Sequence, residues 1–285
     1  MKTSDYIKEF GDVERKFAER FEIPRQLTVY NQYDGNDCTG FATATAAEII
    51  FKRRMSAGWY MMQSKAEGQK GDGRFIQKVL DAACNVGGVP LADFGILGEV
   101  VDVLESLRNN AQLLAIAKKY KLDGVCSLLY ADRKKRDMCI KDAVMRYDEG
   151  VAVIATSNRY FGENHAICIV GYNDKTDKYI FQNSQGKEYG TKGRGEIPKD
   201  KLDTVYAVFK KGISLPFADI DPNGWSYEDI KVAYDAGIIK GASETEFVPR
   251  RTVTREEVGA MLGRLVRMLD EREERNILIS HQWEV

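Results

Sequence analysis

The chain has 285 residues, of which 44% are hydrophobic and 30% are charged, and its formal net charge is −1. This balance is that of a soluble globular protein with one sizeable core and a smaller second unit. A pI of about 6.2 excludes the basic footprint that nucleic-acid binding requires. The sequence has no apolar run of membrane-spanning length and no secretory signal among its charged first residues, so we expect synthesis in a cytoplasm and no membrane contact.

Five cysteines and only two histidines, His165 and His281, limit the chemistry that the chain can carry. An odd number of cysteines without a CxxC pair argues against a disulfide framework and against a zinc site. We therefore predict no metal and no cofactor. His281 lies in a polar tail, where we expect it to be solvated and without a role, so His165 is the candidate for catalysis.

The first half of the sequence predicts helices. Residues 1–30 form a polar segment with helical character, and a turn-rich stretch leads into CTGFATATAAEIIF, which begins at Cys38. That run is small and apolar on nearly all sides, which predicts a buried helix capped by Asp37 or Asn36. Further helical patterns occupy residues 75–83 and 99–120, and the first of these ends at Gly87-Gly88-Val89-Pro90.

The second half begins with strands. Short apolar runs separated by turns (VAVIAT, HAICIV, KYIFQN and TVYAVF) follow residue 150. Helices followed by strands predict an α+β domain. A linker near 211–216 divides the chain into domains 1–212 and 213–285. The second domain has two helical patterns; Trp225, Ile230 and Tyr234 share one face of the first, and a capping box at 254–257 opens the other.

Cys38 is the candidate nucleophile. A cysteine nucleophile reacts as the thiolate, which the N-terminus of a helix favours, and Cys38 begins the predicted buried helix. The other four cysteines lie inside helical or strand patterns, where small buried hydrophobic residues are the simpler interpretation.

The run HAICIVGY, the turn NDKTDK and the run YIFQN predict an antiparallel hairpin centred near Asp174 and Lys175. His165 and Asn183 then lie opposite or nearly opposite one another, with Cα atoms about 4.5–5.5 Å apart. The Asn183 side-chain oxygen can accept from one imidazole nitrogen and fix the tautomer, which leaves the other nitrogen free to take a thiol proton. The alternative is a solvent-facing histidine and a turn asparagine.

Four motifs in this order resemble the papain family of cysteine peptidases. QYDGNDCTGF resembles the nucleophile segment, with Gln32 six residues before Cys38, and GDGRFIQKVLDAACNVGGVP resembles the glycines of the substrate cleft and the helix after them. NHAICIVGY resembles the histidine strand, and NSQGKEYGTKGRGEIP the asparagine segment. The resemblance covers residues 32–200 and implies a two-lobed α+β fold, with a helical lobe and a β-barrel-like lobe, that hydrolyses polypeptides.

The resemblance assigns the catalytic roles. It implies that Cys38 attacks the peptide carbonyl and that His165 protonates the leaving amine, while Asn183 orients His165. Gln32 and the Cys38 backbone N–H would donate to the oxyanion, and one such donor is worth ~3–4 kcal/mol.

The same resemblance implies that Gly71 and Gly73 pair with extended substrate backbone, where a side chain would obstruct the approach. The sequence also departs from the family, which has Trp where this chain has Thr39 and Gln185. The second Trp shields the histidine–asparagine bond from water, so we expect the histidine to be held less firmly here. Asp37 places a negative charge beside the thiolate and raises its pKa. These departures indicate a slow or narrowly tuned enzyme.

Residues 217–266 resemble an S-layer homology domain, with the signals FAD, Trp225, GIIKG, FVP and TREE in order. This resemblance implies binding to anionic, pyruvylated polysaccharide of a bacterial cell wall. Arg255, at a helix N-terminus, could grip a carboxylate, and Trp225 could stack on a sugar face; the alternative has both residues bonded or packed internally. The family uses three repeats, so with one copy we expect tight binding to need a homo-oligomer.

The predicted function is therefore a cysteine endopeptidase tethered at a bacterial wall, where it acts in place, after lysis or from a phage particle. Three alternatives stay open. One is an amidase or endopeptidase that cuts peptidoglycan. Another is a peptidase that removes leader peptides, which shares the spacing of Gln32 and Cys38 but prefers Asp at position 183. The third is an inert wall-binding scaffold.

Overall fold

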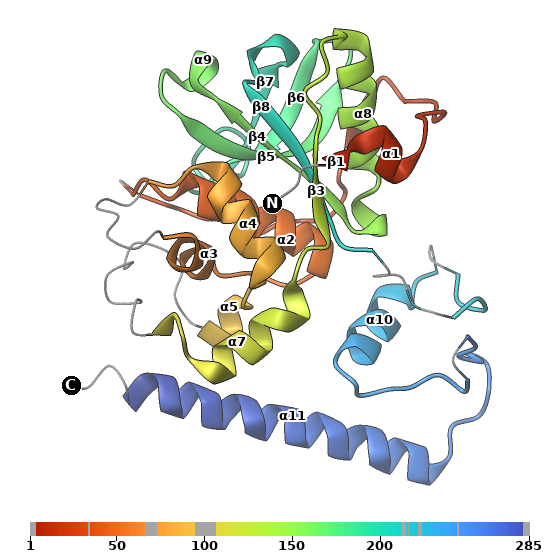
Figure 1. The fold of residues 1–285 in the computed structure, drawn as a ribbon. Helices are drawn as coiled ribbons and strands as arrows, with labels where there is room; N and C mark the ends of the chain where they lie inside the picture. Colours follow the sequence, from red (N-terminus) through yellow and green to blue (C-terminus); the bar gives the residue numbers. More distant parts are fainter. Residues whose placement is uncertain are drawn as a thin grey trace. The chain divides into compact units, whose positions relative to one another are not determined.

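The chain divides into two units, Met1–Lys211 and Gly212–Val285, one residue from the boundary expected from the linker. The computed structural model describes residues 4–33, 35–65, 73–94, 107–211, 215, 217–221, 224–243 and 245–281. In the first unit, Figure 1 shows the helices α2, α3 and α4 gathered at one end and most of the strands at the other. This two-part arrangement is the one that the α+β prediction requires.

Helix α2 (Cys38–Phe51) is the buried helix that the sequence predicts, since thirteen of its fourteen residues are buried. Two of its buried threonines are satisfied within the helix: Thr43 and Thr45 donate to carbonyl oxygens four residues earlier, at 2.7 and 3.0 Å. The predicted side-chain cap is wrong. Asp37 occupies the N-cap position but makes no capping hydrogen bond, because its backbone (φ −100°, ψ 21°) is not extended as a capping residue requires.

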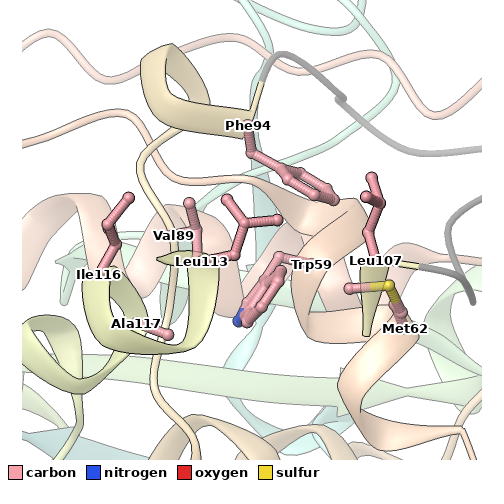
Figure 2. Close-up of a cluster of buried hydrophobic side chains, with 8 residues drawn as sticks. All are labelled: Trp59, Met62, Val89, Phe94, Leu107, Leu113, Ile116 and Ala117. Carbon is pink, nitrogen blue, oxygen red and sulfur yellow. The ribbon is translucent and has the colours of Figure 1, made fainter. Parts of the chain in front are cut away.

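The other helices of this lobe enclose a hydrophobic cluster around Trp59 (Figure 2). Its members come from α3 (Ala57–Ser64), α5 (Leu91–Phe94) and α7 (Ala111–Ala117), together with Val89 and Leu107 outside these helices; helix α4 (Ile76–Asn85) packs against α3. The Trp59 indole N–H donates to the Gly87 carbonyl at 3.0 Å. Gly87 has φ +102°, and a Cβ there would lie 1.9 Å from the Ala117 carbonyl oxygen, so only glycine ends α4 in this way.

The predicted helix at 99–120 is only partly found. Within the residues that the structure describes, it covers Ala111–Ala117 and continues as the 3₁₀ turn Lys118–Tyr120. Residues 99–106 lie outside the described residues.

The sheet contains eight strands, in the order β1-β3-β8-β4-β5-β6-β7, with β2 paired to β5. Their bounds are β1 (Ser4–Asp5), β2 (Arg20–Glu22), β3 (Gly124–Ser127), β4 (Val151–Ser157), β5 (His165–Asn173), β6 (Lys178–Gln182), β7 (Arg194–Pro198) and β8 (Thr204–Phe209). The four predicted strands are β4, β5, β6 and β8, and they pair antiparallel. Helix α8 (Arg133–Met145) contacts β4 and β5, and the short helix α9 (Asn158–Phe161) connects these two strands.

The helical character expected over residues 1–30 is largely wrong. Within residues 4–30, which the structure describes, a helix forms only at α1 (Tyr6–Phe10), whereas Arg20–Glu22 is a strand. Its backbone pairs with β5, where Phe21 lies opposite Tyr172. Local propensity is overridden because the pairing of β5 with β4 ends at Ile169, so beyond it this edge of β5 has backbone groups that β2 can pair.

A buried carboxylate on α2 fixes the segment that leads to the site. Glu48 is 3% exposed and accepts hydrogen bonds from the backbone N–H and the hydroxyl of Thr28, both at 3.1 Å. The Tyr30 hydroxyl lies 3.5 Å from its other oxygen. Helix α2 itself contacts β4 and β5, so the helix that begins at Cys38 and the strand that begins at His165 are held together by the core.

The second unit contains α10 (Tyr227–Asp235) and α11 (Arg255–His281), and α10 packs against a small core of Leu215, Phe217 and Ile220. The predicted capping box is confirmed: the Thr254 N–H donates to the Glu257 carboxylate at 2.8 Å, and the Glu257 N–H donates to the Thr254 hydroxyl at 3.1 Å. Of the helices that the structure describes, none combines the length and apolar character that crossing a membrane requires.

The placement of Trp225 on the face of the first helix is wrong. Ile230 and Tyr234 pack on the small core as predicted, but α10 begins after Trp225, whose side chain is 93% exposed. Because α10 starts at Tyr227, the helical spacing that linked Trp225 to Ile230 does not apply to it.

Candidate active site

Cys38 is the first residue of α2 and is 8% exposed. Its sulfur lies 4.0 Å from the carbonyl oxygen of Asn164, and the backbone N–H of Ala166 is close enough to lower the pKa of the thiol. These two residues flank His165 in the chain, so the start of the buried helix lies against the start of β5. The two candidates for thiol chemistry are thus neighbours, although 126 positions separate Cys38 from Asn164.

The surroundings of Cys38 favour the neutral thiol in the free protein. Burial raises the pKa of the Cys38 thiol above its ordinary value, and the backbone N–H groups of Ala166 and Thr39 lower it. The carboxylates of Asp37 and Glu163 raise it further, as the sequence suggested for Asp37. The pKa therefore moves in the direction opposite to that expected from the helix N-terminus alone.

His165 opens β5, is 4% exposed, and has its Nε2 atom 2.7 Å from Oδ1 of Asn183. When Nε2–H donates to that oxygen, Nδ1 is the nitrogen that can take up a proton. Burial lowers the pKa of His165 below its ordinary value, and the hydrogen bond to Asn183 and the charge of Glu163 oppose the change. The lowered pKa favours the neutral imidazole near neutral pH, and the Asn183 oxygen favours the tautomer that carries the proton on Nε2.

The register behind this contact differs from the expected one. The turn between Asn173 and Lys178 is centred between Lys175 and Thr176, and the bulge at Ile169/Gly171 shifts the pairing again, so that Cys168 lies opposite Gln182. Continued outward, this register sets Asn183 against Ile167 rather than His165. The contact still forms because Ile167 and His165 point to the same face, and diagonal neighbours on one face are within side-chain reach.

Gln32 is 8% exposed and held at both ends of its amide. Its Nε2 donates to the Gly35 carbonyl at 2.9 Å, and its Oε1 accepts from the Ser184 hydroxyl at 2.5 Å. The Gln32 backbone N–H also donates to the Ser184 carbonyl at 2.7 Å. An amide NH₂ group carries two hydrogens, so Nε2 has a second hydrogen that the bond to Gly35 does not use.

The structure describes some, but not all, of the other positions singled out in the sequence. Gly71 lies outside the described residues. Gly73 is exposed, and a Cβ there would approach the protein no closer than 3.9 Å, to Asn36, so the fold itself leaves room for a side chain. Thr39 is buried, with its hydroxyl 3.6 Å from the sulfur of Met61, so it faces the core. Gln185 accepts a hydrogen bond from Nδ2 of Asn183 at 3.0 Å.

Sequence reasoning missed three contributors. Ser184 ties Gln32 to the segment that carries Asn183, and its position next to Asn183 was an available signal. The ring of Phe161 lies 4.6 Å from that of His165, centroid to centroid, and the charge of Glu163 acts on both Cys38 and His165. Phe161 and Glu163 lie in the connection before β5, where the sequence carried no signal. Within the described part of the chain, no group of three or more His, Cys, Asp or Glu residues could hold a metal.

The two residues predicted to bind wall polymer are both at the surface of the second unit. Arg255 begins α11 and is exposed, and Trp225 lies in the turn before α10. A cavity of about 760 Å³ in this unit has the cations Lys240, Arg251 and Arg264 in its lining, and neither predicted residue is among the residues that line it. The interpretation in which Trp225 is a buried core residue is thus excluded.

Two family models match the chain. Residues 136–207 match the model for the papain family of cysteine proteases, and residues 216–258 match the S-layer homology domain. His165 and Asn183 lie within the first range, whereas Cys38 and Gln32 precede it. Both resemblances noted in the sequence are confirmed, with the S-layer homology domain C-terminal to the peptidase region.

Solved structures share the fold of the chain. Xylellain, a cysteine protease from Xylella fastidiosa, is 17% identical, with a TM-score of 0.56 over 68% of this chain and 87% of that one. Procathepsin L 3 from the larval midgut of Tenebrio molitor is 15% identical, with a TM-score of 0.54 over 72% of each chain. Bromelain from Ananas comosus is 15% identical, with a TM-score of 0.51 over 68% of this chain and the whole of that one. These likenesses confirm the papain-like α+β fold.

One curated protein resembles part of the chain. An endoglucanase from Bacillus sp. (strain KSM-635) is 40% identical over 50 residues, which are 18% of this chain and 5% of the endoglucanase. The chain therefore spans only a small fraction of that relative.

Proposed function

We propose that this chain, which joins a papain-like cysteine peptidase domain to an S-layer homology domain, is an endopeptidase tethered to anionic polymer of a bacterial cell wall. We assign the chemistry to Cys38, His165, Asn183 and Gln32. The observation that carries this assignment is the 2.7 Å contact between His165 and Asn183 beside the helix start at Cys38. A nucleophile, a base and an orienting group in one buried site form the arrangement that thiol-dependent acyl transfer needs.

The reaction begins from an uncharged pair. Burial raises the pKa of Cys38 and lowers that of His165, so near neutral pH the thiol is protonated and the imidazole can act as a base. As the sulfur attacks the peptide carbonyl carbon, the thiol proton moves to Nδ1 of His165. The resulting imidazolium donates from Nε2 to Oδ1 of Asn183, which favours the charged form at the moment it appears.

The developing oxyanion is the charge that most needs stabilisation. The second Nε2 hydrogen of Gln32 and the backbone N–H of Cys38 are the proposed donors, and one such donor is worth ~3–4 kcal/mol. His165 then gives its proton to the leaving amine, and the C–N bond breaks to leave a thioester on Cys38. A water molecule, deprotonated by His165, attacks this thioester, releases the carboxylic acid product and restores the thiol.

The peptidase domain implies a polypeptide substrate, and the S-layer homology domain implies association with a cell wall. We propose that the exposed Arg255, at the N-terminus of α11, meets a carboxylate of the polymer and that the exposed Trp225 adds contact area. One charge-assisted hydrogen bond is worth about 1.5–3 kcal/mol net, which is small against the entropy lost on binding. Tight retention on the wall is therefore expected only from several copies acting together.

Cleavage profiling of a peptide library with the full chain tests the proposed activity. We expect internal cleavage of polypeptides by the wild type and none by Cys38→Ala. A fall in the turbidity of a cell-wall suspension, without cleavage of the peptide library, would instead support a peptidoglycan-cleaving enzyme. Cleavage confined to one site after a leader segment would support a leader-removing peptidase. No turnover of either substrate class, with Cys38 inert to alkylation, would support a scaffold.

A further inference from the structure

The amide of Asn183 is held at both ends. Its Oδ1 accepts from Nε2 of His165 at 2.7 Å and from the backbone N–H of Ser184 at 2.9 Å. Its Nδ2 donates to Oε1 of Gln185 at 3.0 Å. Asn183 is 3% exposed, so this amide has little access to water.

From these contacts we propose that Gln185 is a positioning residue of the active site, whose side-chain oxygen fixes the orientation of the Asn183 amide and, through it, the tautomer of His165. The inference rests on the proposed peptidase function and adds to it a residue outside the Cys38, His165, Asn183 and Gln32 set.

The physical reason lies in the near symmetry of a carboxamide. Its oxygen and nitrogen occupy almost the same volume, but only the oxygen accepts a hydrogen bond. If the Asn183 amide rotated by half a turn, Nδ2 would face Nε2–H of His165, donor against donor. A neutral imidazole would then move its proton to Nδ1, the nitrogen that must stay free to receive the thiol proton. The orientation of Asn183 therefore decides whether His165 can act as a base.

Two groups select the productive orientation. The Ser184 N–H needs an acceptor and therefore faces Oδ1, whereas Oε1 of Gln185 needs a donor and therefore faces Nδ2. Tyr189 is also near this amide, since burial raises the pKa of Tyr189 and the side chain of Asn183 lowers it. Gln185 accepts from Nδ2 at 3.0 Å, an ordinary hydrogen-bond length.

The backbone of Gln185 is anchored although its side chain lies at the surface. It forms an antiparallel bridge with Asn31, and the next N–H, that of Gly186, donates to the Tyr30 carbonyl at 2.9 Å. These bonds tie Gln185 to the segment that runs directly into Gln32. The segment that contains Gln32 and the segment that contains Ser184 and Gln185 therefore hold both the Asn183 amide and the proposed oxyanion donor.

Gln185 does not supply the apolar cover of His165. That cover comes from Phe161, whose ring meets the His165 ring at 4.6 Å and 64°, and which packs in turn on Phe181 at 5.8 Å. In the papain family the residue at the position of Gln185 is a Trp that shields the bond. Here the shielding lies with Phe161, which leaves this position free to make a hydrogen bond.

The test replaces the acceptor while keeping the length of the side chain. In the full chain, Gln185→Met removes the strong acceptor, and Gln185→Glu retains it. We expect Gln185→Met to lower kcat on a fluorogenic peptide about tenfold, as loss of a partner that orients a functional group commonly does, with KM within about twofold. Gln185→Glu should stay within about threefold of the wild type. Lys187→Met, at an exposed position in the same loop, is the matched control and should leave both constants unchanged.

A second readout does not depend on activity. With only two histidines in the chain, ¹⁵N-histidine NMR resolves His165 from His281. In a Cys38→Ala background, above the imidazole pKa, we expect Nε2–H with Gln185 in place and with Gln185→Glu, and a mixture of tautomers with Gln185→Met. If peptide cleavage is absent altogether, the proposed function fails while this measurement still tests Gln185.

Three results would overturn the inference. One is a wild-type kcat and a wild-type tautomer in Gln185→Met. Another is an equal loss in Gln185→Met and Gln185→Glu, which would mean that the loop structure rather than the acceptor matters. The third is a mixed tautomer in Tyr189→Phe but not in Gln185→Met, which would assign the orientation to Tyr189.

Discussion

The two units present their candidate functional residues in opposite ways. In the first unit, Gln32, Cys38, His165 and Asn183 are each less than 9% exposed, and each meets partners distant in the sequence. In the second unit, Trp225 is 93% exposed and Arg255 lies at the surface. The first site is a buried network and the second is a set of surface groups on a small core.

The difference indicates what each site can do. A buried polar network excludes water and fixes hydrogen-bond directions, so removal of one member leaves others unsatisfied and costs more than its own bond. An exposed cation gains little from a single contact, because water and salt compete with it. We therefore expect large effects of single substitutions in the first unit and small ones in the second.

The largest expected effect is that of Cys38→Ala. Loss of the nucleophile should lower kcat/KM on a fluorogenic peptide by ~10⁴-fold or more, as removal of a nucleophile does in enzymes whose catalytic residues act as a unit. The melting temperature should change little. Cys84→Ala, in α4, is the matched control and should keep wild-type activity. Equal losses in the two variants would contradict the assignment of the nucleophile.

The second effect is that of Asn183→Ala, which removes the acceptor of His165 and the partner of Gln185. We expect kcat to fall about 10–100-fold with KM nearly unchanged, because orientation of the base is lost rather than substrate binding. Stopped-flow or steady-state assays on the same peptide measure this. A wild-type kcat would mean that the 2.7 Å contact has no part in turnover.

Arg255→Ala probes the exposed region. Loss of one charge-assisted contact should weaken binding to purified anionic wall polymer about tenfold, following the ~1.5–3 kcal/mol of such a bond, and kcat/KM on soluble peptide should not change. Arg267→Ala, an exposed arginine on the same helix, controls for net charge. Unchanged retention on the polymer in a sedimentation assay would remove Arg255 from the binding surface.

The smallest effect is a shift in pH dependence. His165 must be neutral to accept the thiol proton, so activity is present above its pKa and is lost as the pH falls through it. Burial lowers this pKa from 6.5, which places the acid limb of the pH–kcat/KM profile below about 6.5. The charge of Glu163 holds the pKa up, so Glu163→Gln should move the acid limb to lower pH.

The charge of Glu163 also raises the pKa of Cys38, so the same variant should alkylate faster with iodoacetamide at a fixed pH. Glu246→Gln, in the second unit, is the control. If the acid limb instead moved to higher pH in Glu163→Gln, the charge of Glu163 would not be raising the pKa of His165.

Part of the fold and of the candidate site could be predicted from local sequence patterns. The helix at Cys38 follows from a run of residues that is small or apolar on nearly all sides, and the box at 254–257 follows from two side chains that satisfy each other's backbone N–H groups. The hairpin prediction brought His165 and Asn183 together even though its register was wrong. A shift by two residues keeps side chains on the same face, so the contact tolerated the error.

The sequence by itself therefore determined the periodic and local features of the molecule: the buried helix, the strands, the capping box and the motifs of both family resemblances. Tertiary structure alone decided that Phe161 covers His165, that Ser184 bonds to Gln32, that residues 20–22 join the sheet and that Trp225 faces solvent. These are contacts or exposures set by packing between segments far apart in the chain. Local periodicity carries no information about such neighbours, because they depend on how distant segments of each unit pack together and not on the residues beside them in sequence.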